Sequence, residues 1–166
     1  MRRLFLTCLL AVFVLAMAAS PIGAVSSPTV ATGTFTLRGD RGSGDVRTYA
    51  FTVQQSSDGT FRGQVQLRTF SGILIRGDVT CFTQEGNQAI VGGTITAFAG
   101  FPEFIGTPFG FAIQDNPDVS TFFYYDADFG SGTPCAGLLG AAGEPDLGSL
   151  LENQGVPITT GNILIH

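Results

Sequence analysis

Few residues of this sequence could carry out acid–base or nucleophilic chemistry, and none has a partner at a diagnostic spacing. The single histidine, His166, is the last residue, and order is weakest near chain ends. A Ser-His-Asp or Cys-His arrangement needs an imidazole held against its nucleophile, so we expect none here. Two carboxylates can hydrolyse a glycoside, but many of the aspartates stand beside Gly, Asn or Pro, as turn residues do. These are Asp40, Asp45, Asp58, Asp115 and Asp118. The sequence assigns no catalytic residue and leaves open whether the protein is an enzyme.

The acidic turns are also weak candidates for a metal site. The segment that starts Asp126-Ala-Asp128 resembles the beginning of a calcium loop, but Gly130 comes one position early and the twelfth position, Gly137, is not an acid. A non-standard site that also uses Asp115 and Asp118 is the alternative. We expect these Asp residues to belong to solvent-exposed turns, and we expect the protein to bind no metal and no cofactor.

Aromatic residues gather in the second half of the sequence. Phe122 to Tyr125 are four consecutive aromatics, which place rings on both faces of a strand, and this requires that both faces be covered or that one be a binding surface. The cluster predicts either a Phe-rich core or an apolar pocket in the mouth of a barrel. The candidate ligand-binding residues are Phe98, Phe101, Phe104, Phe109, Phe111, Phe123 and Tyr125.

Three glycines favour the pocket. Gly63, Gly77 and Gly93 fall at inward positions of consecutive expected strands, so side-chain volume is missing there. We expect a cavity between these glycines and the aromatic cluster, roofed by the loop 99–107.

The first residues have the order of an export signal. Arg2 and Arg3 precede an apolar run from Leu4 to Ala19, too short to span a membrane comfortably, and small residues follow. We expect a signal peptide over residues 1–24 and a single β domain over residues 25–166, secreted or otherwise extracytoplasmic. Without the signal, 6 Arg stand against 13 acidic residues, a formal charge of −7. Such a surface argues against nucleic acid and against anionic membranes as partners and suits cations or basic groups better.

Two cysteines remain after the expected signal. In an exported domain, Cys81 and Cys135 are expected to form a disulfide. The alternative is a pair of separately buried thiols.

The pattern along the rest of the chain has a period of two, interrupted by glycine, which predicts strands and turns. The Ser56–Gly59 segment is a hairpin signal, and Gly92-Gly93 suggests a bulge or sharp bend. The expected strands are 32–38, 46–55, 61–69, 73–83, 89–98, 109–114, 119–125 and 161–166. Their number and short connections predict an all-β fold, a single antiparallel barrel of about eight strands, with a two-layer β-sandwich as the alternative. One short helix is expected near the C-terminus, over residues 145–153.

Several of these turns resemble those of an uncharacterised group of small secreted bacterial β-rich proteins. The shared features are a strand ending in Cys81, a GN-x-A turn over residues 86–89, an acidic DN turn at 115–116 and the terminal GNILIH strand. Pro117 departs from the group, in which a glycine commonly follows the DN pair. The resemblance implies the fold and export, and implies no activity.

Two functions from different classes are therefore expected. The first is a secreted, non-catalytic β-barrel that binds a small apolar ligand or a partner surface. The second is a small barrel enzyme, either a carboxylate-dependent hydrolase or a cyclase or isomerase acting on an apolar substrate, which needs only one acid or Tyr hydroxyl.

Overall fold

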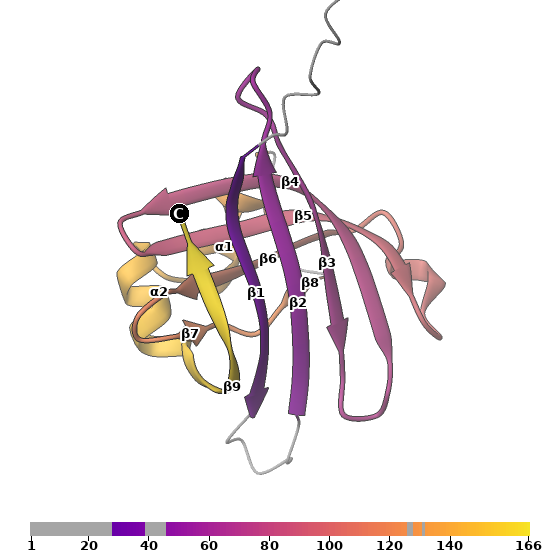
Figure 1. Ribbon diagram of the computed structural model, residues 1–166. Coiled ribbons are helices and arrows are strands. Elements are labelled where there is room, and N and C mark those ends of the chain that lie inside the picture. The colour runs from indigo at the N-terminus through magenta and orange to yellow at the C-terminus, as the bar shows by residue number, and fades with distance from the viewer. Residues whose placement is uncertain (1–27, 39–45, 126–127, 131) are drawn as a thin grey trace, which may run out of the picture.

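A computed structural model of the protein describes residues 28–38, 46–125, 128–130 and 132–166. The expected signal, residues 1–24, lies outside them, as do Asp40, Asp45 and Asp126. Over the described residues the strands form one closed antiparallel barrel with two short α-helices beside it (Figure 1). The predicted barrel is confirmed, and the sandwich alternative is wrong.

The strands are β1 (Thr29–Arg38), β2 (Val46–Gln55), β3 (Phe61–Arg68), β4 (Leu74–Glu85), β5 (Gln88–Phe98), β6 (Pro108–Gln114), β7 (Val119–Ser120), β8 (Tyr124–Tyr125) and β9 (Val156–Ile165). The helices are the 3-10 turn η1 (Pro102–Phe104) and the α-helices α1 (Pro134–Ala142) and α2 (Leu147–Gln154).

Antiparallel pairing runs without a break from β1 to β6. On its other side β6 pairs with β7, which pairs with β9, and β9 returns to β1. Eight strands thus close the ring, and β8 is an additional strand beside β6. Closure pairs the edges that an open sheet would leave free, except along the part of β9 that extends beyond β7.

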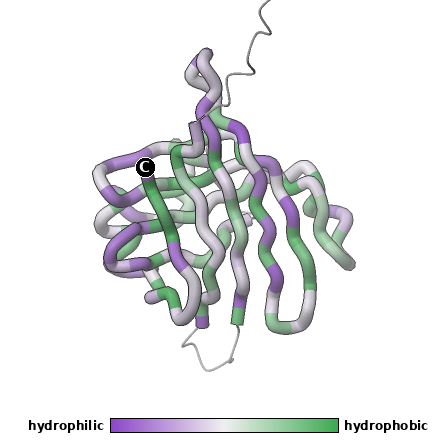
Figure 2. Tube along the Cα trace, viewed as in Figure 1, coloured by the Kyte–Doolittle hydropathy of each residue, from purple (hydrophilic) through white to green (hydrophobic). Residues whose placement is uncertain are grey.

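Alternate side chains of β1 to β4 point into the barrel, which explains the period of two. Figure 2 shows hydrophilic and hydrophobic residues alternating along the strands at the front of the view. The interior is filled by apolar side chains, and its largest fully buried members are aromatic: Phe35, Tyr49, Phe109 and Phe111. A barrel of about eight strands is just wide enough for side chains to fill it.

Strands β5 and β6 are buried on both faces, because the helices cover their outer side. Leu138 of α1 and Leu150 of α2 are fully buried in a second apolar cluster with Ile90 and Ala112, outside the barrel interior. Small residues on β6 allow this approach: a Cβ at Gly110 would lie 3.2 Å from the Leu138 side chain. The helices therefore pack directly on the barrel wall.

A disulfide joins Cys81 of β4 to Cys135 of α1, with 5.9 Å between the two Cα atoms. Both cysteines are buried in the second cluster. The expected pairing is confirmed in the structure, and it fixes the start of α1 to the barrel. Among the described residues, no helix is long and apolar enough to cross a membrane.

The C-terminal third differs most from expectation. The strand expected over residues 119–125 is two short pieces, β7 and β8, and β9 begins at Val156 rather than at residue 161. The expected helix over 145–153 is α2, displaced by about one residue at its end and two at its start. Helix α1 was not expected at all.

The barrel seam beside β9 is completed by carboxylates. Because β7 pairs with β9 only at Val156 and Pro157, much of that edge of β9 has no strand beside it. Asp118 Oδ2 accepts a hydrogen bond from the Ile163 N–H at 3.2 Å, and Asp115 Oδ2 accepts one from the Ile165 N–H at 3.3 Å. These side chains take the place of ladder acceptors.

We expect Asp118→Ala to lower the free energy of unfolding by about 1.5 kcal/mol, because hydrogen bonds to charged groups contribute about 1.5–3 kcal/mol and Asp118 is partly exposed. Urea unfolding followed by circular dichroism measures the change. Glu152→Ala, at an exposed position of α2, should stay within about 0.5 kcal/mol of the wild type. If Asp118 instead held calcium, a chelator would destabilise the wild type as much as the substitution does.

Candidate functional site

An apolar pocket opens at the end of the barrel where the β3–β4 and β5–β6 connections lie. Its volume is about 170 Å³. It is lined by Arg47, Leu67, Thr69, Ile73, Ile75, Phe98, Phe101, Phe104 and Tyr125. We call it the mouth pocket. It sits above the packed interior, since Leu67 and Ile75 below it are almost fully buried.

Four aromatic rings form one wall of the mouth pocket. The centroids of Phe98, Phe104 and Tyr125 lie 5.3 to 5.4 Å from one another. Phe101 extends the group, with its centroid 5.2 Å from that of Phe98. Three of these contacts are edge-to-face, and the Phe98–Phe104 pair is tilted. Such contacts fix the rings relative to each other, so the wall is in place without a ligand.

The loop 99–107 carries two of these rings and is held by its own hydrogen bonds. The Phe101 N–H donates to the Phe98 carbonyl at 3.1 Å, and the Thr107 hydroxyl donates to the Phe104 carbonyl at 2.8 Å. Gly106 takes a φ of 91°, a conformation that other residues rarely adopt. The loop thus places Phe101 and Phe104 in the lining of the mouth pocket, whereas the sequence led us to expect it as the roof of a cavity beside the three glycines.

Apolar side chains also stand exposed around the mouth. Phe70 in the β3–β4 connection is 76% exposed, and Ile105 in the β5–β6 connection is 51% exposed. Singly exposed apolar side chains are common in folded proteins, so their bearing on binding comes from their position beside the mouth pocket.

Arg47 brings a positive charge to this apolar site. In β2, Arg47 lies on the same inward-facing side as Tyr49 and Phe51. Its guanidinium carbon lies 4.7 Å from the centroid of the Phe122 ring. A cation over an aromatic face is attracted by the ring quadrupole. None of the nine described residues that line the pocket is acidic. The alternation of β2 could have identified Arg47 from sequence, since it is a charged residue in an apolar phase.

The seven candidate ligand-binding residues divide into two groups. Four of them line the mouth pocket: Phe98, Phe101, Phe104 and Tyr125. The other three belong to the packed core: Phe109, Phe111 and Phe123. Phe109 stacks on Phe123 with the ring centroids 4.7 Å apart, deep inside the barrel. Core and pocket are therefore both present, in adjoining layers.

The cavity expected beside the three glycines does not exist, because Phe109 occupies that space. A Cβ at Gly77 would lie 2.5 Å from the Phe109 ring, and one at Gly93 would lie 2.9 Å from it. Gly63 serves a different purpose, since a Cβ there would meet the Thr52 carbonyl of the neighbouring strand. The glycines admit a large ring and a close strand, and the pocket lies nearer the barrel end.

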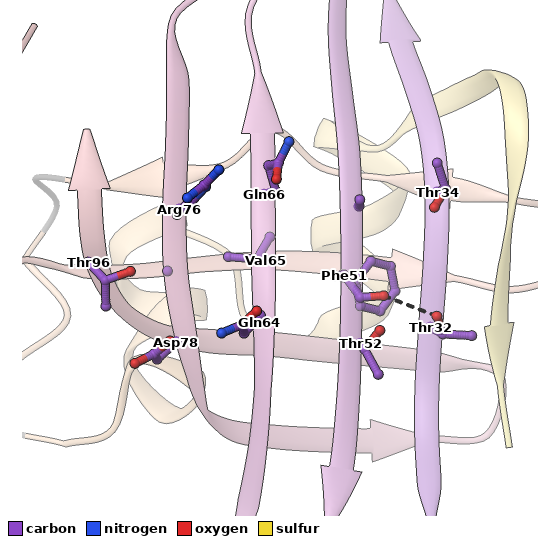
Figure 3. Close-up of a pocket in the computed structure, with 12 residues that line it drawn as sticks. Thr32, Thr34, Phe51, Thr52, Gln64, Val65, Gln66, Arg76, Asp78 and Thr96 are labelled. Carbon is purple, nitrogen blue, oxygen red and sulfur yellow. Dashed lines mark hydrogen bonds between the residues drawn. The ribbon is translucent and has the colours of Figure 1, made fainter. Parts of the chain in front are cut away.

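A second hollow, of about 500 Å³, lies on the outer face of β1 to β5. Figure 3 shows its Thr, Gln, Arg and Asp side chains rising from successive strands. The register places Thr32 beside Thr52, Thr52 beside Gln64, and Gln64 beside Asp78. These residues are the outward-facing, polar members of the alternating strands, and such a surface is typical of a sheet face that is exposed to water. We therefore assign it no apolar ligand.

Catalytic groups do not gather in the described structure. Asp115 and Asp118 bind the backbone of β9, and Asp58 accepts hydrogen bonds from Thr60 in the hairpin turn. The Thr60 hydroxyl, and then the Thr60 N–H, lower the pKa of the Asp58 carboxyl, which is a property of the turn. Among the described residues there is no group of three or more His, Cys, Asp or Glu side chains able to hold a metal ion.

Comparisons with models of protein families, with curated proteins and with solved structures found no match to this chain. The resemblance to small secreted bacterial proteins, inferred from turn sequences, stays an expectation. A functional proposal therefore depends on the arrangement of the side chains alone.

Proposed function

We propose that this protein is an exported, non-catalytic β-barrel that binds a small apolar ligand in the mouth pocket. The observation that carries the proposal is the four-ring wall of Phe98, Phe101, Phe104 and Tyr125 around an open apolar hollow. Binding sites for small molecules are typically concave, apolar and preformed, with a few polar groups. The mouth pocket has these properties.

The size of the pocket restricts the ligand. A cavity of about 150 Å³ lined by apolar side chains accommodates benzene, and the mouth pocket measures about 170 Å³. Drug-sized ligands need about 300 Å³ or more. The pocket therefore suits one aromatic ring or a short alkyl chain, with any larger remainder lying over the exposed Phe70 and Ile105.

Export is supported by two independent features. Disulfides persist mainly in oxidising compartments, and Cys81 and Cys135 are bonded. The sequence before residue 25 has the charge and hydropathy order of a signal peptide. Together they favour a mature domain that works outside the cytoplasm.

The alternative is an enzyme that uses the same pocket. A hydrolase dependent on carboxylates has no candidate acid among the described lining residues. Among the described lining residues, Tyr125 is the one whose hydroxyl could act as an acid on an apolar substrate. A cyclase or isomerase is therefore the form of this alternative that the pocket favours.

A neutral single-ring probe tests the binding function. We expect 3-phenylpropanol to bind the wild type in the millimolar range or tighter, because even about 0.3 kcal/mol per atom gives about 3 kcal/mol for a ligand of about ten heavy atoms. Ile73→Trp places a larger side chain in the pocket and should weaken binding at least tenfold. Ligand-observed NMR titration measures both constants.

The neighbouring residue provides the matched control. Leu74 shares the outward phase of β4 with Arg76, whereas Ile73 lines the pocket. Leu74→Trp adds the same indole outside the pocket and should leave binding unchanged. Equal binding by Ile73→Trp and the wild type, or no binding by the wild type, would contradict the proposal.

A further inference from the structure

We propose that the outer face of β1 to β4 carries a second binding site, independent of the mouth pocket, for a neutral glycan with extended β-1,4 linkages. The hollow on this face has a volume of about 500 Å³, within the range of about 300–1,000 Å³ that small-molecule sites occupy. Its shape is a trough between two rows of polar side chains that cross the strands (Figure 3). Position and chemistry of these rows carry the proposal.

The register of the strands places the two rows. Each row contains one outward-facing residue from each of the strands β1 to β4. The rows are Thr32, Thr52, Gln64, Asp78 and Thr34, Ala50, Gln66, Arg76. Residues two apart on a strand are separated by about 7 Å, which sets the width of the trough. The residues between the rows, Phe51, Val65 and Gly77, also belong to the lining, so strand backbone forms the floor.

Ala50 deepens the trough at β2. It lies between Thr34 on β1 and Gln66 on β3, and its outward-facing neighbours on β2, Thr48 and Thr52, are longer. The outer wall of a closed barrel is convex around the barrel axis, so a hollow on it requires that side-chain volume be missing. The methyl group of Ala50 leaves that space open.

Polar neighbours on adjacent strands bond to each other elsewhere on this barrel. Gln88 of β5 donates to the Gln114 side chain of β6 at 2.9 Å. The hydroxyls of Thr36 on β1 and Thr48 on β2, next to the trough, lie 3.4 Å apart. Such pairs use donors and acceptors that would otherwise face only water.

The cross-strand neighbours in the trough are not paired in this way. Gln64 lies beside Asp78, and Gln66 lies beside Arg76. Among the described residues, none of these four side chains has a hydrogen-bond or ion-pair partner in the protein. Figure 3 shows them rising from β3 and β4 along the two sides of the trough. Their donors and acceptors are therefore available to a ligand.

The kinds of group in the trough select a ligand rich in hydroxyls. An amide both donates and accepts, a guanidinium only donates, and a carboxylate only accepts. A sugar hydroxyl also donates and accepts, so adjacent hydroxyls match each of these groups. Among the described lining residues only Arg76 and Asp78 are charged, and their charges cancel. The trough therefore suits a neutral glycan better than an anionic or cationic one.

The direction of the trough selects the linkage. Neighbouring strands lie about 4.8 Å apart, and an extended β-1,4-linked glycan advances by about 5 Å per ring. A chain that runs along the trough therefore places one ring over each strand, with its hydroxyls directed to both rows. An α-1,4-linked chain coils and leaves the trough after one or two rings.

Titration of the isotopically labelled mature protein with cellotetraose, followed by amide NMR shifts, tests the site. We expect shifts confined to β1 to β4 and a dissociation constant in the millimolar range, because Phe51, the one aromatic residue in the described lining, belongs to the core and no ring is left for a sugar to stack on. Gln66→Ala combined with Arg76→Met removes one facing pair of side chains and should weaken binding about tenfold.

A second facing pair provides the matched control. Gln54 of β2 and Arg62 of β3 are also cross-strand neighbours on the exposed outer face, but they lie outside the trough. Gln54→Ala combined with Arg62→Met should leave the binding of cellotetraose unchanged. Equal weakening by both double variants would show attraction to the outer face in general and would overturn the site.

Maltotetraose tests the linkage, because it has four glucose rings joined by α-1,4 bonds. We expect it to bind at least fivefold more weakly than cellotetraose. Equal binding of the two, or no binding of cellotetraose, would overturn the inference. Binding of 3-phenylpropanol in the mouth pocket should be the same in the wild type and in the Gln66→Ala, Arg76→Met variant, so the failure of one site does not imply the failure of the other.

Discussion

Replacing both Cys81 and Cys135 with alanine is expected to lower the free energy of unfolding by about 4 kcal/mol. The disulfide closes a loop with a sequence separation of 54, and the chain-entropy model gives about 4 kcal/mol for a loop of that length. The packing that the folded state loses is small by comparison, because each substitution removes only one buried sulfur atom. Urea unfolding of the double variant, against the oxidised wild type, measures the difference.

Reduction of the wild type provides the control for this prediction. Treatment with a thiol reductant should produce the same loss as the double substitution, because both open the same loop without changing the rest of the chain. A loss below about 1 kcal/mol in both experiments would contradict the entropic account. Two alkylatable thiols in protein purified without reductant would show that the bridge does not form.

The barrel could be predicted from sequence because its strands alternate between apolar and polar residues and are joined by turns that contain glycine. β2, expected over residues 46–55, is observed over Val46–Gln55, and its alternation directly reflects one face in the core and one in solvent. The Ser56–Gly59 turn is observed with Gly59 at a φ of 83°. A register irregularity lies at Gly92-Gly93, but its extra residue is in the partner strand β4, between Val79 and Cys81, rather than in β5 where the sequence led us to expect it.

The C-terminal third could not be predicted because side chains there replace backbone pairing. The Ala112 N–H donates to the Thr121 hydroxyl at 2.9 Å, and the Phe123 N–H donates to the Tyr49 hydroxyl at 3.1 Å. These bonds interrupt the ladder and split the expected strand into β7 and β8. No period in the sequence reports such a tertiary substitution.

The sequence indicates helix α1 by the residues at its two ends rather than by the spacing of apolar residues within it. The Thr133 side chain accepts a hydrogen bond from the Ala136 N–H, Pro134 is its first residue, and Gly143 ends it with a φ of 74°. These are standard helix boundaries. Its interior is mostly Ala, Gly and Leu, which provides no clear apolar stripe to predict a helix.

Only part of the candidate site could be predicted from sequence. Sequence placed the aromatic residues together, but it could not distinguish rings at the mouth from rings in the core, because both follow the same inward phase. Depth along the strand decides: Phe98 ends β5, whereas Phe111 lies in the middle of β6 and is fully buried. Strand ends must be known before a pocket can be placed.

Gly77→Ala is expected to lower the free energy of unfolding by about 3 kcal/mol, at the upper end of the range for overpacking a core. The new methyl group would lie 2.5 Å from the Phe109 ring and 3.0 Å from the Thr94 carbonyl. Phe109 cannot yield easily, because it is fully buried and stacked on Phe123. Urea unfolding measures the loss.

Two further variants show whether the Phe109 ring is the cause. Phe109→Leu replaces the ring with a smaller aliphatic side chain. The double variant with Gly77→Ala should therefore be more stable than the sum of the single losses predicts, by about 1 kcal/mol or more. Gly140→Ala, in α1 where a Cβ meets nothing within 4 Å, should instead stabilise by about 0.5–1 kcal/mol. An open cavity beside Gly77 would give the opposite result for Gly77→Ala, a gain in stability, because the methyl group would then fill empty space. The sign of this one substitution therefore separates a barrel packed by Phe109 from a barrel with a ligand chamber at its centre, and it confines any ligand to the mouth.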